Sequence, residues 1–92
     1  MQALAEIQVI PLGVGISVRR QVKRAQAIIE ESGLLFEAHA YGTNVEGDLD
    51  AILATVKRIH ETLNAEGTPR IATALKLGTR TDKAPTLKGK RL

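Results

Sequence analysis

The sequence contains no cysteine and no tryptophan, and Phe36 and Tyr41 are its only Phe or Tyr residues. The absence of cysteine excludes a disulfide framework, a thiolate metal site and a cysteine nucleophile, and it fits a reducing compartment. The scarcity of aromatic rings argues against RNA recognition, because the expected third strand, "TNVE", offers no surface on which a base could stack.

Long apolar runs are also missing. None approaches the roughly 20 residues that a membrane span needs, and Glu6 lies in the N-terminal segment, where a signal peptide would be apolar. We therefore expect a cytoplasmic protein without a membrane partner.

What the sequence does have is the composition of one compact domain. It has 92 residues, of which 43% are hydrophobic and 25% are charged. A chain of this length buries only about 60 to 65% of its unfolded surface, so burial between subunits would add to a thin core. We expect a single domain over residues 1–92.

The net charge of +3 is unevenly distributed. Residues 76–92 hold six basic side chains and Asp82 as their only acid, whereas residues 1–75 hold seven basic and nine acidic groups. A basic segment of this kind can bind nucleic acid, but it lacks interleaved aromatic residues. We expect no nucleic-acid partner and interpret the segment as a solvated or subunit-contacting tail.

Alternation and helical spacing predict four strands and two helices. The strands cover residues 3–11, 34–41, 43–46 and 70–78, and the helices run between Ser17 and Gly33 and between Asp48 and Gly67. Ser17 and Asp48 are the expected N-caps. The expected apolar stripe of the first helix is Val18, Val22, Ala25 and Ile29, and that of the second is Leu49, Ile52, Leu53, Val56, Ile59 and Leu63.

The resulting β-α-β-β-α-β order is that of the α+β ferredoxin-like sandwich, in which two helices cover one face of a four-stranded antiparallel sheet. The usual strand order gives the sheet two functional ends. We expect one end to hold Pro11, Gly13, Gly15, Ser17, Tyr41, Gly42 and Thr43, and the other to hold Glu46, Arg80, Asp82 and Lys83.

Each end offers binding chemistry beside a purely structural interpretation. The glycine-bearing loop before Ser17 is either an anion site at a helix N-terminus or a simple tight turn. Glu46 is either a capping carboxylate or an acceptor for a ligand's amino group or a nearby cation such as Arg80 or Lys83. Asp82 has the same two interpretations, and a surface turn is its default.

The sheet face without helices is partly apolar. It is expected to carry His39 and Tyr41 together with Leu4, Ile10 and Leu35, which favours a subunit interface over a solvated face. His60 is expected at the surface. Because the two histidines lie on separate elements, we expect no metal site.

Catalysis has one candidate precedent. Acylphosphatases are short ferredoxin-like enzymes with an arginine after the first strand and an asparagine on the third, a layout that Arg19 or Arg20 and Asn44 echo. The loop "PLGVGISVRR" and the segment "GTNVEG" differ from the sequences that those enzymes use, so we expect no enzymatic activity and no catalytic residue.

Four sequence features, taken together, resemble the small thiamine-binding protein family. They are Pro11 with Gly13, the Gly42-Thr43 and Glu46-Gly47 pairs, the spaced Arg80, Asp82 and Lys83, and the ending Thr86-Leu87 with Gly89-Lys90. Family members often have threonine where this chain has Val14 and methionine where it has Tyr41.

The resemblance implies a ferredoxin-like homo-oligomer, a dimer or a dimer of dimers, that binds thiamine or its hydroxymethylpyrimidine moiety without transforming it. It implies a ligand pocket near subunit contacts and no cofactor. The positions it suggests for binding are Gly13, Ser17, Thr43, Asn44, Glu46, Arg80 and Asp82. From the chemistry of its ring, and not from the resemblance, we expect Tyr41 to offer a stacking surface for a heterocycle.

Two functional classes therefore stay open. The first is vitamin B1 salvage, delivery or sensing, with thiamine, its pyrimidine precursor or a phosphate ester as the ligand. The second is a structural or regulatory assembly module that takes no small molecule.

Overall fold

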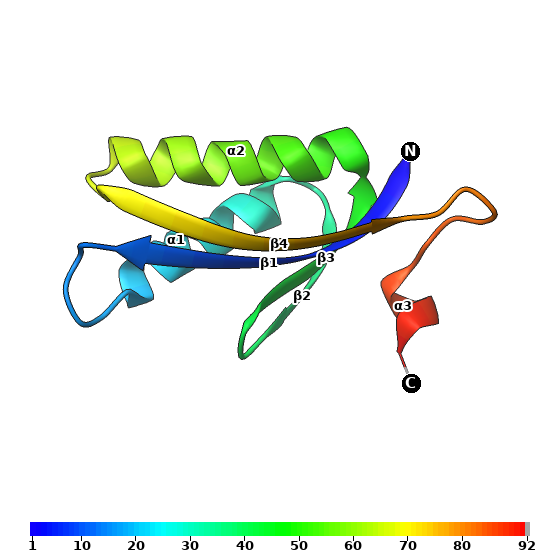
Figure 1. Cartoon of the computed structure of the whole chain (residues 1–92), viewed down its shortest axis with the longest axis horizontal. Helices are drawn as coiled ribbons and strands as arrows, with labels where there is room; N and C mark the ends of the chain where they lie inside the picture. Colours follow the sequence, from blue (N-terminus) through cyan, green and yellow to red (C-terminus); the bar gives the residue numbers. More distant parts are fainter. Residues whose placement is uncertain (92) are drawn as a thin grey trace.

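A computed structural model describes residues 1–91 and shows the expected α+β architecture (Figure 1). The elements are β1 (Gln2–Leu12), α1 (Arg19–Glu31), β2 (Leu35–His39), β3 (Gly42–Asp48), α2 (Leu49–Ala65), β4 (Arg70–Thr79) and the short α3 (Leu87–Lys90). The four strands form one antiparallel sheet in the order β2-β3-β1-β4. The prediction of a ferredoxin-like sandwich is confirmed, and α3 is an addition to it.

The core lies between the sheet and the helices α1 and α2. Along β1, Ala3, Ala5 and Ile7 are buried at every second position, as strand alternation requires. These residues pack with Ala25, Ile28, Ile29, Leu34, Val45, Ile52, Ile59 and Leu63. One sheet face is therefore sealed by the helices, and the neighbouring residues of each strand point to the other face.

The strands differ in length, and this difference shapes the molecule. The β1–β4 ladder runs from the Ala3–Thr79 pair to the Leu12–Arg70 pair, whereas the β1–β3 ladder ends at Ile7–Thr43. The last five residues of β1 thus extend about 17 Å beyond the β2–β3 hairpin. We predicted that the loop after β1 would lie at the same end as the hairpin turn. The direction is right, but this extension separates the two.

Helix α1 starts later and presents a different stripe than the sequence indicated. It begins at Arg19, and its N-cap residue is Val18, whose side chain makes no capping bond, so the prediction of Ser17 as N-cap is wrong. Val22 is 45% exposed, and Gln21 occupies the buried position instead. The true stripe is Gln21, Ala25, Ile28 and Ile29.

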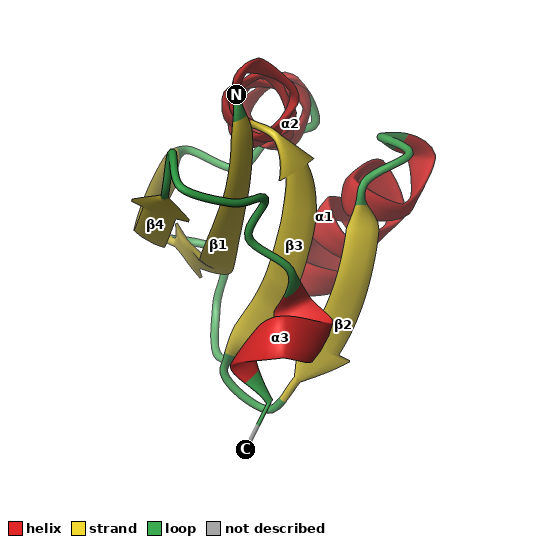
Figure 2. Cartoon of the chain, turned by 90° about the vertical axis from the view of Figure 1, so that its right-hand side faces the viewer, coloured by secondary structure: helices red, strands yellow, loops and turns green. Residues whose placement is uncertain are grey.

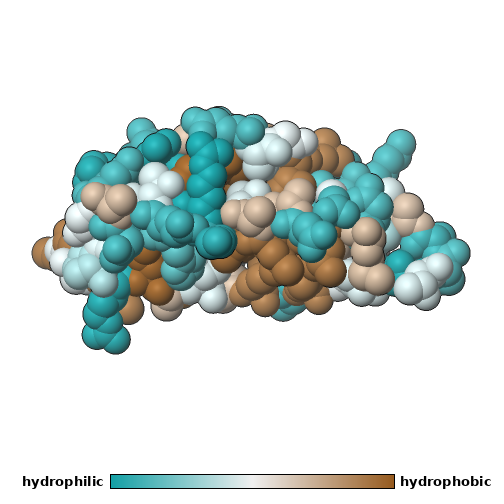
Figure 3. Space-filling model, turned by 90° about the horizontal axis from the view of Figure 1, so that it is seen from above, coloured by the Kyte–Doolittle hydropathy of each residue, from teal (hydrophilic) through white to brown (hydrophobic). Residues whose placement is uncertain are grey.

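Helix α2 follows the prediction at its start. Asp48 accepts hydrogen bonds from the N–H groups of Asp50 (3.1 Å) and Ala51 (3.4 Å), which confirms it as the N-cap. His60, expected at the surface, instead contacts the sheet, with its Nε2 2.6 Å from Thr73 Oγ1. Leu53, expected in the apolar stripe, is exposed. Seen from the α2 side, hydrophilic side chains are interspersed with apolar ones (Figure 3).

The basic C-terminal segment folds back onto the sheet. After β4 the chain crosses to the face without α1 and α2, and α3 lies in front of β2 and β3 in Figure 2, whereas α1 lies behind them. Leu87 is buried, and Thr86 Oγ1 accepts from Gly89 N at 2.9 Å. The segment expected to be a solvated or subunit-contacting tail is thus part of the fold.

Candidate functional site

The predicted binding residues fall into four separate places. Tyr41 and Thr43 line a pocket at the hairpin turn, and Asn44 and Glu46 lie on the opposite sheet face. Gly13 and Ser17 lie in the loop between β1 and α1, and Arg80 and Asp82 lie in the loop after β4. Within one chain, the structure does not bring the eight positions into a single pocket.

The pocket at the turn, called here the hairpin pocket, has a volume of about 500 Å³. It is bounded by α1, by the hairpin and by the part of β1 where the ladder with β3 ends. Its apolar wall includes Val9, Val22, Ile29 and Phe36, and its polar side chains are Lys23, Gln26, Glu30 and Thr43. A partly apolar hollow of this size with a few polar groups is typical of small-molecule sites.

A hydrogen bond between strand and helix fixes the polar wall of the pocket. Thr43 is buried, and its Oγ1 donates to Gln26 Oε1 at 2.9 Å. Because this bond engages the amide oxygen, the donor nitrogen of Gln26 is the part of the side chain that suits another molecule. Thr43 therefore acts on the pocket chiefly by orienting Gln26.

The turn itself is held tightly against β1. Gly42 has a φ of +155°, and a Cβ at this position would lie 2.6 Å from the carbonyl oxygen of Ile7. Only glycine allows this approach. Beside it, Tyr41 is 75% exposed, and its N–H donates to His39 Nδ1 at 3.3 Å. An exposed aromatic ring thus stands on a rigid turn at the rim of the pocket.

Asn44 and Glu46 belong to the other face of β3 because side chains alternate along a strand. Asn44 Oδ1 lies 3.1 Å from His39 Nε2, and the same nitrogen lies 3.3 Å from a carboxylate oxygen of Glu6. Glu46 Oε1 accepts from Leu87 N at 2.8 Å, so this carboxylate caps α3 and does not meet Arg80 or Lys83. The capping interpretation of Glu46 is the one that the structure matches.

Arg80 and Asp82 pair with each other in the loop after β4. Arg80 Nε donates to Asp82 Oδ1 at 2.6 Å, and a second contact joins the guanidinium to Oδ2. The Arg80 guanidinium lowers the pKa of Asp82, and the Asp82 carboxylate raises the pKa of Arg80. Arg80 also borders a small hollow of about 220 Å³ with Leu4, Gly78 and Lys90.

The loop between β1 and α1 is shaped by packing against the start of β4. Gly13 has a φ of +76°, and a Cβ there would lie 3.0 Å from Pro69 Cγ. Ser17 Oγ makes only a long contact of 3.5 Å with Arg19 N. Both residues lie beyond the extension of β1, away from the hairpin pocket.

The contribution of α1 to the pocket was not predicted from the sequence. Val22, Gln26 and Glu30 line the pocket, and their spacing of four residues places them on one helix face. The predicted core stripe included Val22, which lines the pocket instead, and it left Gln26 and Glu30 without a role. Among residues 1–91, no cluster of three or more His, Cys, Asp or Glu side chains could hold a metal ion. No helix in that range is both long and apolar enough to cross a membrane.

Comparison with known proteins identifies relatives over nearly the whole length. A family model described as "Thiamine-binding protein" matches residues 5–91. A UPF0045 protein from Synechocystis sp. is 46% identical over 87 residues, covering 95% of this chain and 72% of that protein. A UPF0045 protein from Methanocaldococcus jannaschii is 39% identical over 89 residues, covering 97% of this chain and 88% of that protein.

Solved structures of similar proteins have the same fold as this chain. The crystal structure of the Methanocaldococcus protein matches with a TM-score of 0.89 at 39% identity, covering 97% of this chain and 91% of that one. A Thermotoga maritima protein provisionally assigned to thiamine biosynthesis or salvage matches with a TM-score of 0.87 at 22% identity, covering 98% of this chain and 95% of that one. At that identity the second likeness shows the fold alone. The family match over residues 5–91 and the identities of 46% and 39% show that this chain belongs to the thiamine-binding protein family.

Proposed function

We propose that this protein binds thiamine or its hydroxymethylpyrimidine moiety in the hairpin pocket and releases it unchanged. The observation that carries the proposal is the Thr43–Gln26 hydrogen bond inside a pocket of about 500 Å³, in a chain that belongs to the thiamine-binding family. The role would be salvage, delivery or sensing of vitamin B1 in the cytoplasm.

The polar groups of the pocket suit this ligand class. An aminopyrimidine offers N–H donors and ring-nitrogen acceptors. The free amide nitrogen of Gln26 can donate to a ring nitrogen, and the second lone pair of its Oε1 can accept from the amino group. Tyr41 stands at the rim, where its ring can stack on a heterocycle. The carboxylate of Glu30 favours the thiazolium cation of thiamine. The pocket therefore matches both halves of the vitamin.

The sheet face opposite α1 and α2 supports a separate proposal about assembly. Leu35 is 59% exposed and shares the sheet face opposite α1 and α2 with Ile10, which is 39% exposed. These apolar side chains support the proposal of a dimer or a dimer of dimers that joins such faces. In that assembly the hairpin pocket would face away from the interface, so Asn44 and Glu46 would serve the contact between subunits and not the ligand.

The test is calorimetric titration with thiamine, hydroxymethylpyrimidine and thiamine phosphate, with the solution mass measured alongside. Saturable binding at a fixed ratio per subunit, followed by recovery of the unchanged ligand, is the expected result. Gln26→Leu should abolish most of the binding, whereas Gln2→Leu, a matched change outside the pocket, should not. Absence of binding by a folded oligomer would contradict the proposal.

The assembly module stays as a second candidate because of the exposed Leu35 and Ile10. It predicts a multimer whose melting temperature does not respond to any of the three ligands, whereas binding raises that temperature by mass action. The acylphosphatase-like alternative has less support: Asn44 lies beside His39, while Arg20 lies between α1 and α2 across the sheet.

A further inference from the structure

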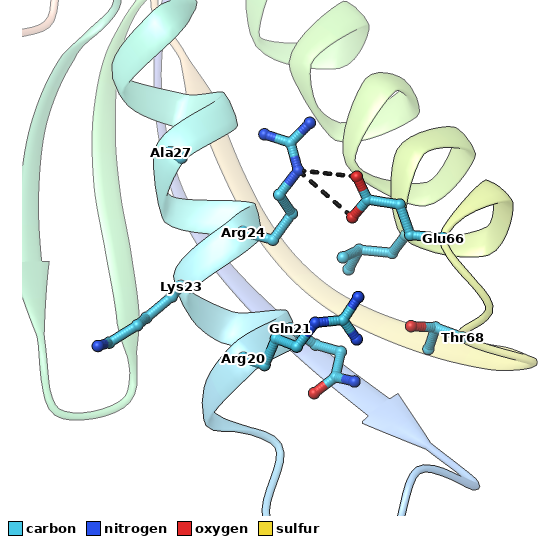
Figure 4. Close-up of a pocket in the computed structure, with 8 residues that line it drawn as sticks. Arg20, Gln21, Lys23, Arg24, Ala27, Glu66 and Thr68 are labelled. Atoms are coloured by element: carbon cyan, nitrogen blue, oxygen red, sulfur yellow. Dashed lines mark hydrogen bonds and ion pairs between the residues drawn. The ribbon is translucent and has the colours of Figure 1, made fainter.

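A second hollow lies on the opposite side of α1 from the hairpin pocket. This interhelix groove has a volume of about 650 Å³ and lies between α1 and the C-terminal end of α2 (Figure 4). It is lined by Arg20, Gln21, Arg24, Leu63, Glu66 and Thr68, among others. None of these residues belongs to the site proposed for thiamine, so a ligand bound in the groove would be independent of that function.

The charges of the groove leave one cation available. Arg24 Nε lies 3.0 Å from Glu66 Oε2 and 3.3 Å from Oε1, so these two charges offset each other. Arg20 forms no ion pair with any residue in the described part of the chain, and its guanidinium reaches from α1 toward α2 in Figure 4. Lys23 points away from the groove. The groove therefore favours an anion.

A buried amide adds a second, independent requirement. Gln21 lines the groove, is only 9% exposed, and its Oε1 has no hydrogen-bond partner within residues 1–91. A buried acceptor without a partner destabilises the fold, and native proteins leave few such groups. Gln21 occupies the core-facing stripe of α1, where the sequence supplies apolar residues at the following turns. A bound molecule with a hydrogen-bond donor would satisfy this oxygen.

We propose that the interhelix groove binds a phosphate group that retains a proton, either free or on a monoester. Arg20 supplies the charge-assisted hydrogen bonds to the phosphate oxygens. The hydroxyl of Thr68, which points toward the groove in Figure 4, supplies a further donor. The phosphate O–H donates to Gln21 Oε1 once rotation of the amide brings this enclosed oxygen to the groove. A phosphate that retains a proton combines negative charge with such a donor.

Three probes at pH 5.5 test the chemistry: inorganic phosphate, sulfate and glycerol 2-phosphate, each followed by amide chemical shifts and calorimetry. Sulfate has a similar shape but carries no proton at this pH and one more negative charge than most of the phosphate, so attraction to Arg20 alone would favour sulfate. Phosphate should nevertheless bind more tightly than sulfate, because only phosphate can donate to Gln21 Oε1. Glycerol 2-phosphate retains a proton there. Tighter binding of this monoester would identify an organic phosphate as the source, and weaker binding would identify the free anion.

Variants locate the site. Arg20→Gln should weaken phosphate binding about tenfold, because it removes a charge-assisted bond, whereas Arg19→Gln removes the same charge from a residue outside the groove and should change it less than about twofold. Glu66→Gln frees Arg24 and should strengthen binding. Gln21→Leu should remove the preference for phosphate over sulfate, and circular dichroism checks that each variant folds.

Three results would overturn the proposal. Equal losses in Arg19→Gln and Arg20→Gln would show diffuse attraction to a basic helix. Equal affinity of the unmodified protein for sulfate and phosphate would show that Gln21 does not accept a hydrogen bond from the ligand. A preference for phosphate over sulfate that survives in Gln21→Leu would show the same.

Discussion

Side chains on the two faces of β3 are neighbours in the sequence but make contacts in different parts of the molecule. Thr43 and Val45 point toward the helices, where Val45 is fully buried and Thr43 holds Gln26. Asn44 and Glu46 point the other way, where one contacts His39 and the other caps α3. Four consecutive residues thus serve two regions on opposite sides of a sheet. Because alternate residues of a strand lie on opposite faces of the sheet, a motif within a strand should first be separated into its two faces before it is interpreted as one site.

The largest expected difference between the faces is in stability. Ile7→Ala should lower the free energy of unfolding by about 2–5 kcal/mol, because it leaves a cavity in the core between sheet and helices. Ile10→Ala, the same change on the same strand but on the face opposite α1 and α2, should cost less than about 1 kcal/mol. Urea denaturation measures both. Equal losses would break the comparison, since they would mean that a second subunit buries Ile10 as deeply as the helices bury Ile7.

The next effect concerns the cap of α3. Glu46→Ala should lower the free energy of local opening of α3 by about 1–3 kcal/mol, because it removes a charge-assisted hydrogen bond to the Leu87 N–H. The free energy of unfolding of the whole chain should change little. Hydrogen exchange at the Leu87 amide reports this opening. Glu37→Ala, which removes an exposed contact to Arg91, is the matched control and should change exchange less. If thiamine affinity fell while α3 stayed protected, Glu46 would act on the ligand and not on the cap.

A smaller effect is expected in the hairpin pocket. Thr43→Val keeps the shape of the side chain but releases Gln26, which should weaken thiamine binding by about 1 kcal/mol, or roughly fivefold. Asn44→Ala changes the neighbouring residue on the other face and should matter less for a single chain. Calorimetry of both variants sharpens the comparison. Similar losses would place the ligand between a pocket of one subunit and the open face of another.

The smallest effect is a pH dependence at the end of β3. The N-terminal ammonium of Met1, together with the N–H groups of Ala51 and Asp50, lowers the pKa of Asp48 below its ordinary value of 3.8. Since the folded state then holds the proton less tightly than the unfolded state, this stabilisation is complete above pH 3.8 and is lost as the pH falls through the lowered pKa.

Urea titrations between pH 2.5 and 6 can follow this loss. Asp48→Asn should show a shallower decline in unfolding free energy over the acidic part of that range than the unmodified protein. Parallel pH curves for the two proteins would show that Asp48 is not the group responsible.

Sequence patterns predicted the fold well because local signals and tertiary structure agree over most of the chain. Alternation along residues 3–11 and the cap at Asp48 both reflect contacts within a few residues, and both are found in the structure. The prediction of the buried stripe of α1 was wrong at Val22 for a physical reason. Val22 is more apolar than Gln21, yet the extension of β1 beyond the hairpin leaves Val22 facing a pocket instead of a packed layer.

The candidate site was less predictable because it depends on contacts between distant segments. The hydrogen bond from Thr43 to Gln26 joins a strand to a helix, and neither residue type predicts which distant residue it will contact. The family resemblance was confirmed over residues 5–91. The eight binding positions stay a prediction, which the experiments on Thr43, Asn44 and Glu46 would begin to test.

The long β1–β4 ladder has a consequence for how the chain folds. It joins residues 3–12 to residues 70–79, so its two strands lie at nearly opposite ends of the sequence. Such distant pairings form slowly compared with helices and hairpins, because a large loop must close before any contact compensates for the lost entropy. During synthesis, β1 therefore lacks its β4 partner until β4 has left the ribosome. Until then its apolar residues stay partly exposed and can associate with other chains.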